Sequence, residues 1–174
     1  MVDRTATTVL VGNPKAASRT RTVGEAVAAR VLRATGGAEP IDVIELADLG
    51  PSLFDWSSGA VKDATARVAA SRLLVVATPV YKATYTGLLK SFLDWFGQTG
   101  LAGVTAVPVM VGAGAAHALA VEVHLRPLLV EIGASVPSRG LFVLEDQLDA
   151  LDGVLDAWAE HASPYLAAAL APRP

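Results

Sequence analysis

The segment GNPKAASRTRT, residues 12–22, brings together residue types that bind anions. Gly12 permits a tight turn at the end of the apolar run TTVLV. Ser18 and Thr20 offer hydroxyl groups, and Arg19 offers a planar cation with several N–H donors. A helix that begins near Thr20 adds free backbone N–H groups at the positive end of its dipole. We therefore interpret the segment as a cradle for a phosphate group.

Simpler interpretations of the same residues stay open, because a Ser or Thr before a helix often serves only as an N-cap and Arg19 could be a solvated charge. The segment is not a P-loop, since Lys15 stands on the wrong side of the loop and a second glycine is missing. The nearest match to a dinucleotide fingerprint is GAGAAH, residues 112–117, which ends in His and follows a later apolar run. We interpret it as a glycine-rich loop that lets the backbone approach a flat ligand.

The composition excludes several other chemistries. The chain has no cysteine, so redox chemistry requires a bound organic cofactor. Its three histidines, His117, His124 and His161, lack metal-ligand spacing and a carboxylate cluster, and no metal site is expected. A formal net charge of -3 argues against a nucleic-acid partner. The absence of a G-x-S-x-G motif leaves an α/β-hydrolase without its nucleophile.

Apolar runs alternate with segments of helical spacing, which predicts an α/β fold whose parallel sheet is covered by helices on both faces. The expected strands are residues 7–11, 41–46, 73–78, 104–111 and 135–144. The expected helices are residues 20–34, 61–70, 85–96, 115–132 and 149–169. Gly36–Pro40 is expected to end the first helix and Pro164 to interrupt or end the last.

With 174 residues, the chain is expected to form one domain over residues 1–174, with the final APRP frayed. Its start, MVDRTATTVLVG, lacks the features of a signal peptide, and a cytoplasmic location is the default expectation. The uncharged stretch between Asp94 and Glu122 contains Pro108 and several glycines, which favours a buried strand and a turn over a membrane span. Ligands of such sheets bind beyond the carboxyl ends of the strands, so the loops after the first, third and fourth strands are the candidates.

Those three loops carry a resemblance to one family. GNPKAASRT stands in the place of the family's phosphate loop, TPVYKATYTGLLKSFLD in the place of its ring-side loop, and GAGAAHALAVEVHLRPLL in the place of its glycine loop and long fourth helix. With these motifs in the right order, the sequence resembles the NAD(P)H-dependent FMN reductases of the flavodoxin-like superfamily. It especially resembles the branch that supplies reduced flavin to two-component monooxygenases such as the alkanesulfonate systems. The resemblance implies a doubly wound, five-stranded parallel sheet of order 2-1-3-4-5.

The resemblance also implies which residues bind FMN. The turn and the phosphate contacts fall on Gly12, Asn13, Ser18, Arg19 and Thr20. The isoalloxazine and ribityl edge falls on Pro79, Val80, Tyr81 and Lys82. The pyrimidine end of the ring falls on Gly112, Ala113 and Gly114. Tyr81 and Tyr85 could instead be ordinary packing residues, and the core is expected to contain Leu88, Leu89, Phe92, Leu93 and Phe96.

The implied activity is hydride transfer from NADH or NADPH to FMN, with no side chain needed as acid or base. Reduced FMN would then leave for a separate monooxygenase. Two alternatives stay open: a reductase that keeps its FMN and reduces quinones, azo compounds or metal ions, and a flavodoxin-type electron carrier. The sequence does not distinguish NADH from NADPH.

The expected fourth helix is apolar on more than one face, which predicts a homo-oligomer, a dimer or a tetramer, assembled through it. Pro127 lies inside this helix and should bend or bulge it near Val123 and His124. In the sulfonate-system relatives, a widening of this helix carries an aromatic residue at the position of Val123, associated with tetramer contacts and flavin release. In this sequence that role is open or has passed to His124, which could equally be a solvent-facing residue.

Overall fold

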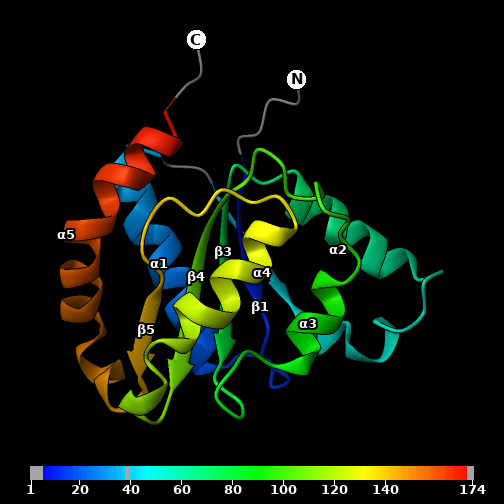
Figure 1. Ribbon diagram of the computed structural model, residues 1–174, viewed down its shortest axis with the longest axis horizontal. Coiled ribbons are helices and arrows are strands. Elements are labelled where there is room, and N and C mark those ends of the chain that lie inside the picture. The colour runs from blue at the N-terminus through cyan, green and yellow to red at the C-terminus, as the bar shows by residue number, and fades with distance from the viewer. Residues whose placement is uncertain (1–5, 38–39, 172–174) are drawn as a thin grey trace.

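The sheet is the framework that places the candidate loops. The computed structural model describes residues 6–37 and 40–171. Five parallel strands lie in the order β2-β1-β3-β4-β5, which confirms the expected flavodoxin-like topology (Figure 1). The strands are β1 (Thr7–Val11), β2 (Ile41–Glu45), β3 (Leu73–Pro79), β4 (Thr105–Gly112) and β5 (Leu141–Leu144). The order reverses between β1 and β3, and their carboxyl ends are therefore the expected ligand edge.

Helices cover both faces of the sheet, as the alternating pattern predicts (Figure 1). One face carries α1 (Arg19–Thr35) and α5 (Leu151–Ala169), and the other carries α2 (Gly59–Ala69), α3 (Gly87–Leu93) and α4 (Arg126–Glu131). Successive residues of a strand point to opposite faces, so Val9 packs with the α1 and α5 side and Leu10 with the other side. Both are fully buried, which explains why the inner strands read as continuous apolar runs.

Side-chain caps define where three of the helices begin. Ser18, Ser58 and Thr86 are the N-caps of α1, α2 and α3, and each hydroxyl accepts a backbone N–H from the first turn. At the other end of α1, Gly36 adopts a left-handed φ of 71°, which confirms that the glycine pair ends this helix. The Thr86 cap also explains why α3 begins at Gly87, two residues after the expected start.

The fifth strand is shorter than expected. Only Leu141–Leu144 pairs with β4, whereas Ser135 forms an isolated bridge to Thr105 and the chain between them is not a strand. The guanidinium of Arg126 donates to the carbonyl oxygens of Val136 and Ser138. Those carbonyls are therefore committed to a side chain, and Pro137 has no N–H to offer a neighbouring strand. The expectation of a strand over residues 135–144 was wrong for this reason.

The fourth helical segment is broken into three parts. A single 3₁₀ turn, Ala115–His117, is followed by a π-helical turn, Val121–Leu125, and then by α4. Arg126 N–H reaches back to the carbonyl of Val121, one residue further than in an α-helix. Pro127 has no N–H for the Val123 carbonyl, so a wider turn fits the backbone here. The predicted bulge near Val123 and His124 is confirmed.

Pro164 does not interrupt or end the last helix, which contradicts that expectation. α5 runs through it to Ala169. Pro164 and Glu160 are both exposed, so the Glu160 carbonyl that loses its usual donor can be hydrated. The expected fraying of the chain end concerns residues 171–174, of which 172–174 lie outside the described residues. Within the described ranges, none of the helices has both the length and the apolarity needed to cross a lipid bilayer.

Candidate functional site

The carboxyl ends of β1, β3 and β4 bring the three candidate loops to one edge of the sheet. Gly12 N–H donates to the Ala77 carbonyl at 2.8 Å, and Val80 N–H donates to the Val111 carbonyl at 2.8 Å. Each loop is thereby fastened to its neighbour. The residues expected at the phosphate end and those expected at the ring end of one ligand therefore lie side by side.

Gly12 is required by the close approach of α3. A Cβ at this position would lie 2.7 Å from the Cβ of Leu89, which no folded protein tolerates without a shift. The Gly12 carbonyl also accepts the Thr86 hydroxyl at 2.6 Å, deep in the buried interior. The turn that begins the candidate phosphate loop is thus locked to the start of α3.

The two hydroxyl groups of the loop both act as acceptors within it. Ser18 Oγ accepts the Arg21 N–H at 3.3 Å, which confirms the N-cap interpretation, and Thr20 Oγ1 accepts Asn13 Nδ2 at 3.0 Å. Asn13 Oδ1 accepts the Lys15 N–H at 2.9 Å, which fixes the orientation of the amide. A hydroxyl can donate while it accepts, and within residues 6–37 and 40–171 no acceptor is found for the O–H of Ser18 or Thr20.

The start of α1 offers further donors. Within the described part of the chain, the backbone N–H groups of Arg19 and Thr20 have no hydrogen-bond acceptor, as expected for the first turn of a helix. The side chain of Arg19 is 66% exposed and its Nη2 donates to Glu145 Oε2 at 3.0 Å. Residues 18–20 therefore supply N–H groups, hydroxyls and a guanidinium as donors in the segment where the sequence predicts a phosphate.

Glu45 is a residue of this site that sequence reasoning missed. Its carboxylate, only 7% exposed, accepts the Ala17 N–H at 2.8 Å and the Arg21 guanidinium at 2.6 Å. Ala17 has a φ of 50°, in the left-handed region, so this bond holds the loop in a strained conformation. The hydrogen bond from Arg21 to Glu45, together with that to Glu25, raises the pKa of Arg21. The available signal was a charged residue at the end of β2, where Val11 of β1 pairs with Glu45.

The ring-side loop leaves β3 at Pro79 and makes a tight turn. Tyr81 and Thr84 exchange backbone hydrogen bonds of 2.9 and 3.2 Å, with Lys82 and Ala83 between them. Both central residues have positive φ, 52° and 66°, as in the mirror-image turn that usually requires glycine or asparagine. Backbone strain of this kind gathers at ligand-binding loops, and here it presents Tyr81, 51% exposed, at the surface.

The two tyrosines of this loop differ in environment. Tyr85 is half-buried and packs against the core, so the ordinary packing interpretation holds for it. Tyr81 is exposed. The expected core residues of α3 behave as predicted, because Leu89, Phe92 and Leu93 are buried and their partly buried neighbours Leu88 and Phe96 pack against the same cluster.

The two glycines of the loop after β4 differ in their surroundings, because side chains lie close to Gly112 and the space beside Gly114 is open. A Cβ at Gly112 would lie 3.0 Å from Phe142 and 3.3 Å from Val80, so protein side chains occupy the space beside it. Gly114 has nothing within 4 Å of the corresponding point, and Ala113 is exposed. Backbone approach by a ligand is therefore open at residues 113 and 114, whereas Gly112 is needed for packing.

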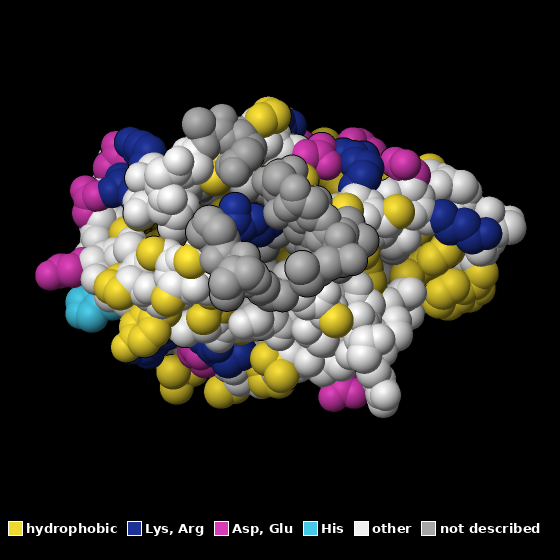
Figure 2. Space-filling model, turned by 90° about the horizontal axis from the view of Figure 1, so that it is seen from above, with side chains coloured by type: hydrophobic (Ala, Val, Ile, Leu, Met, Phe, Trp, Pro, Cys, Tyr) yellow, Lys and Arg dark blue, Asp and Glu magenta, His cyan; other side chains and the backbone are white. Residues whose placement is uncertain are grey.

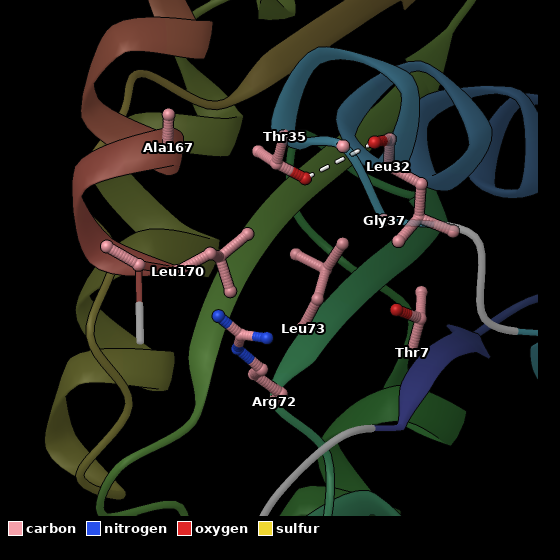
Figure 3. A pocket seen from close by; sticks show the side chains of 10 residues that line it. Thr7, Leu32, Thr35, Gly37, Arg72, Leu73, Ala167 and Leu170 are labelled. Atoms are coloured by element: carbon pink, nitrogen blue, oxygen red, sulfur yellow. Dashed lines mark hydrogen bonds between the residues drawn. The ribbon is translucent and has the colours of Figure 1, made fainter. Parts of the chain in front are cut away.

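A pocket of about 390 Å³ lies at the opposite edge of the sheet, where β1 and β3 begin and α1 and α5 end. Figure 2 views the molecule from that edge and shows a Lys or Arg side chain near the centre of the view. Figure 3 shows the Arg72 guanidinium pointing toward Leu170, near Leu73. This pocket shares none of the candidate binding residues. In the described ranges no group of three or more His, Cys, Asp or Glu residues could hold a metal ion.

Comparison with known proteins assigns the family. A profile of the family described as NADPH-dependent FMN reductase matches residues 5–149. The chain is 39% identical over 101 residues to FMN reductase (NADPH) of Escherichia coli strain K12, an alignment that covers 58% of this chain and 52% of that protein. It is 30% identical over 148 residues to NADH-dependent FMN reductase SfnE of Pseudomonas putida, covering 80% and 76%. The chain thus spans about half the length of the first relative and three quarters of the second.

A solved structure agrees with this assignment over nearly the whole chain. The apo form of an NADH:FMN oxidoreductase (EMOB) superposes with a TM-score of 0.74 and 31% sequence identity, covering 97% of this chain and 91% of that one. The family profile, the sequence relatives and the superposed structure all describe FMN reductases. The chain belongs to the NADPH-dependent FMN reductase family.

Proposed function

We propose that this chain is an NAD(P)H-dependent FMN reductase whose flavin lies across the carboxyl ends of β1, β3 and β4. The observation that carries the proposal is the unused donor capacity of the phosphate loop. Ser18 and Thr20 each accept one hydrogen bond, and among the described residues their O–H groups and the N–H groups at the start of α1 have no acceptor. A set of donors without an acceptor fits a phosphate dianion. The FMN reductases named among the relatives and the superposed structure support the choice of FMN.

The proposed roles follow the three loops. Gly12 and Asn13 shape the turn, and Ser18, Arg19 and Thr20 hold the phosphate. Pro79, Val80, Tyr81 and Lys82 lie along the ring and ribityl edge. Gly112 supports the far loop through packing, and the backbone of Ala113 and Gly114 meets the pyrimidine end, which refines the expectation from sequence. Bound FMN supplies the hydride-accepting ring, so the chain needs only to orient flavin and nicotinamide.

The phosphate contact is tested by Arg19→Ala. Loss of a charge-assisted hydrogen bond is expected to cost about 1.5–3 kcal/mol, which is about tenfold or more in FMN affinity. Riboflavin lacks the phosphate, so its affinity should change much less. Arg33→Ala removes the same charge from the exposed far end of α1 and serves as the matched control. Equal losses for FMN and riboflavin in fluorescence titrations would show that Arg19 does not contact the phosphate.

We further propose that reduced FMN leaves for a partner monooxygenase. Catalytic oxidation of NADH or NADPH in the presence of excess free FMN is the expected result, and the two nicotinamides are compared directly because the relatives are named for both. An electron carrier would not oxidise nicotinamide catalytically. Stoichiometric FMN that survives extensive dialysis, with no increase in turnover on adding FMN, would favour the flavin-retaining reductase.

The proposed assembly is a homo-oligomer formed through the π turn and α4. Leu119, Val123 and Val130 are 59%, 56% and 53% exposed, and they lie on and beside these two turns. Large apolar side chains that face solvent in one chain are commonly covered by a partner. His124 is also exposed here and would then lie at the edge of the contact.

A further inference from the structure

The carboxylate of Glu145 forms an ion pair with Arg19, the arginine at the start of α1 that is proposed to bind the phosphate. It is the first residue after β5 and begins the 3₁₀ segment Glu145–Ala150. Its Oε2 accepts Arg19 Nη2 at 3.0 Å, across 126 positions of sequence. The two side chains are 43% and 66% exposed, so the pair lies at the rim of the site and not in the core.

The carboxylate occupies Arg19 in the way a phosphate oxygen would. Carboxylates and phosphates both match the donor geometry of a guanidinium, so the two anions compete for the same N–H groups. An incoming phosphate must displace Glu145 or remain close to a second negative charge. Exposed ion pairs are weak, so the Glu145 contact can yield to a ligand, at a cost in that ligand's affinity.

We propose that Glu145 is an affinity-setting residue that competes with the FMN phosphate for Arg19. It weakens the binding of phosphorylated flavin and speeds its release, while flavin without a phosphate is unaffected. The inference rests on the proposed phosphate site. It gives this chain a built-in displacing group, which suits a protein that binds FMN in each turnover and gives it up again.

The test is the affinity of Glu145→Gln for FMN and for riboflavin. Removing an exposed competing charge is expected to tighten FMN binding about two- to fivefold, with a slower dissociation rate in stopped-flow measurements and no change for riboflavin. The gain should shrink at high ionic strength. Asp146→Asn is the matched control. It removes the same charge from the neighbouring exposed residue, and Asp146 makes no ion pair with Arg19.

Competition for Arg19 is separated from simple repulsion by repeating the comparison in an Arg19→Ala background. If Glu145 acts through Arg19, Glu145→Gln gives no gain there. A gain that persists without Arg19, that Asp146→Asn matches, or that riboflavin shares overturns the inference. If Arg19→Ala lowers FMN and riboflavin affinity equally, the phosphate site itself fails. If Arg19→Ala is phosphate-selective and Glu145→Gln changes nothing, only the role of Glu145 fails. Thermal unfolding of each variant confirms that the fold is intact.

Discussion

At the scale of single residues, the site depends on side chains that form hydrogen bonds to the phosphate loop itself and need not contact the ligand. Glu45 has no need to contact a flavin, yet it ties Ala17 and Arg21 to the end of β2 and so fixes the shape of the phosphate loop. Glu145 accepts a hydrogen bond from Arg19 at the same loop. Two carboxylates thus surround a loop that is expected to bind an anion, one buried and structural, the other exposed and displaceable.

Glu45→Gln is expected to destabilise the protein and loosen the loop. The amide replaces one acceptor oxygen with an N–H₂ group, so either Ala17 N–H or Arg21 loses its partner at the buried side chain of residue 45. Loss of a hydrogen bond to a charged group costs about 1.5–3 kcal/mol, measured as a fall in the free energy of unfolding in urea. Glu25→Gln, which removes the more exposed carboxylate that also pairs with Arg21, should cost less than about 0.5 kcal/mol. Equal effects of the two variants would contradict the structural role of Glu45.

At the scale of elements, the ring-side turn stores strain that a single substitution can release. Ala83 has a φ of 66°, a conformation that costs a residue with a Cβ about 1–2 kcal/mol. Ala83→Gly should therefore raise the free energy of unfolding by about 1 kcal/mol despite the entropy of glycine. Ala60→Gly, in the first turn of α2, should lower it by about 0.5–1 kcal/mol. A decrease for Ala83→Gly in chemical unfolding would show that the turn is not strained.

The π turn is held to the chain before β5 by a pair of charges whose contribution depends on pH. Burial disfavours the charged form of Glu122, but hydrogen bonds from Arg126 and Gly140 N–H and the charges of Arg126 and Arg139 lower its pKa below the ordinary 4.5. A carboxyl whose pKa is lower in the folded state stabilises the protein above its unfolded pKa, and that stability is lost as the pH falls below about 4.5.

Glu122→Gln should therefore reduce the stability difference between pH 7 and pH 4. The glutamine does not ionise, so the proton uptake that links Glu122 to unfolding is absent. Urea unfolding at both pH values measures the difference for wild type and variant. Asp63→Asn removes a carboxyl that is 70% exposed, and it serves as the charge-matched control. An unchanged pH dependence in Glu122→Gln would mean that the ionisation of Glu122 is not coupled to folding.

At the scale of the whole molecule, the parts that the sequence predicts are those set by local pattern. Continuous apolar runs gave the inner strands, and Gly36 and Pro127 marked a helix end and a helix bulge because their backbone chemistry acts locally. Local pattern marks Glu45 only as a charge at a strand end, and it does not reveal the partners of Glu45 and Glu145, which lie 28 and 126 positions away. The length of β5 could not be predicted from local pattern either. It depends on the Arg126 guanidinium, which donates to the carbonyl oxygens of Val136 and Ser138 ahead of the strand. Hydrogen bonds and ion pairs between residues distant in sequence are therefore seen only in the structure.

Assembly is a property of the whole molecule, and Val123→Glu tests the proposed interface. Val123 is 56% exposed at the π turn, between the exposed Leu119 and Val130. If this strip is covered by a second copy, a buried and unpaired carboxylate there is strongly unfavourable, and the oligomer should dissociate. Light scattering after gel filtration is expected to give a multiple of 17.9 kDa for wild type and a smaller mass for the variant. Ala66→Glu, on the exposed side of α2, should leave the mass unchanged. A monomeric wild type would contradict the assembly itself, and an intact oligomer in Val123→Glu would move the interface to another surface.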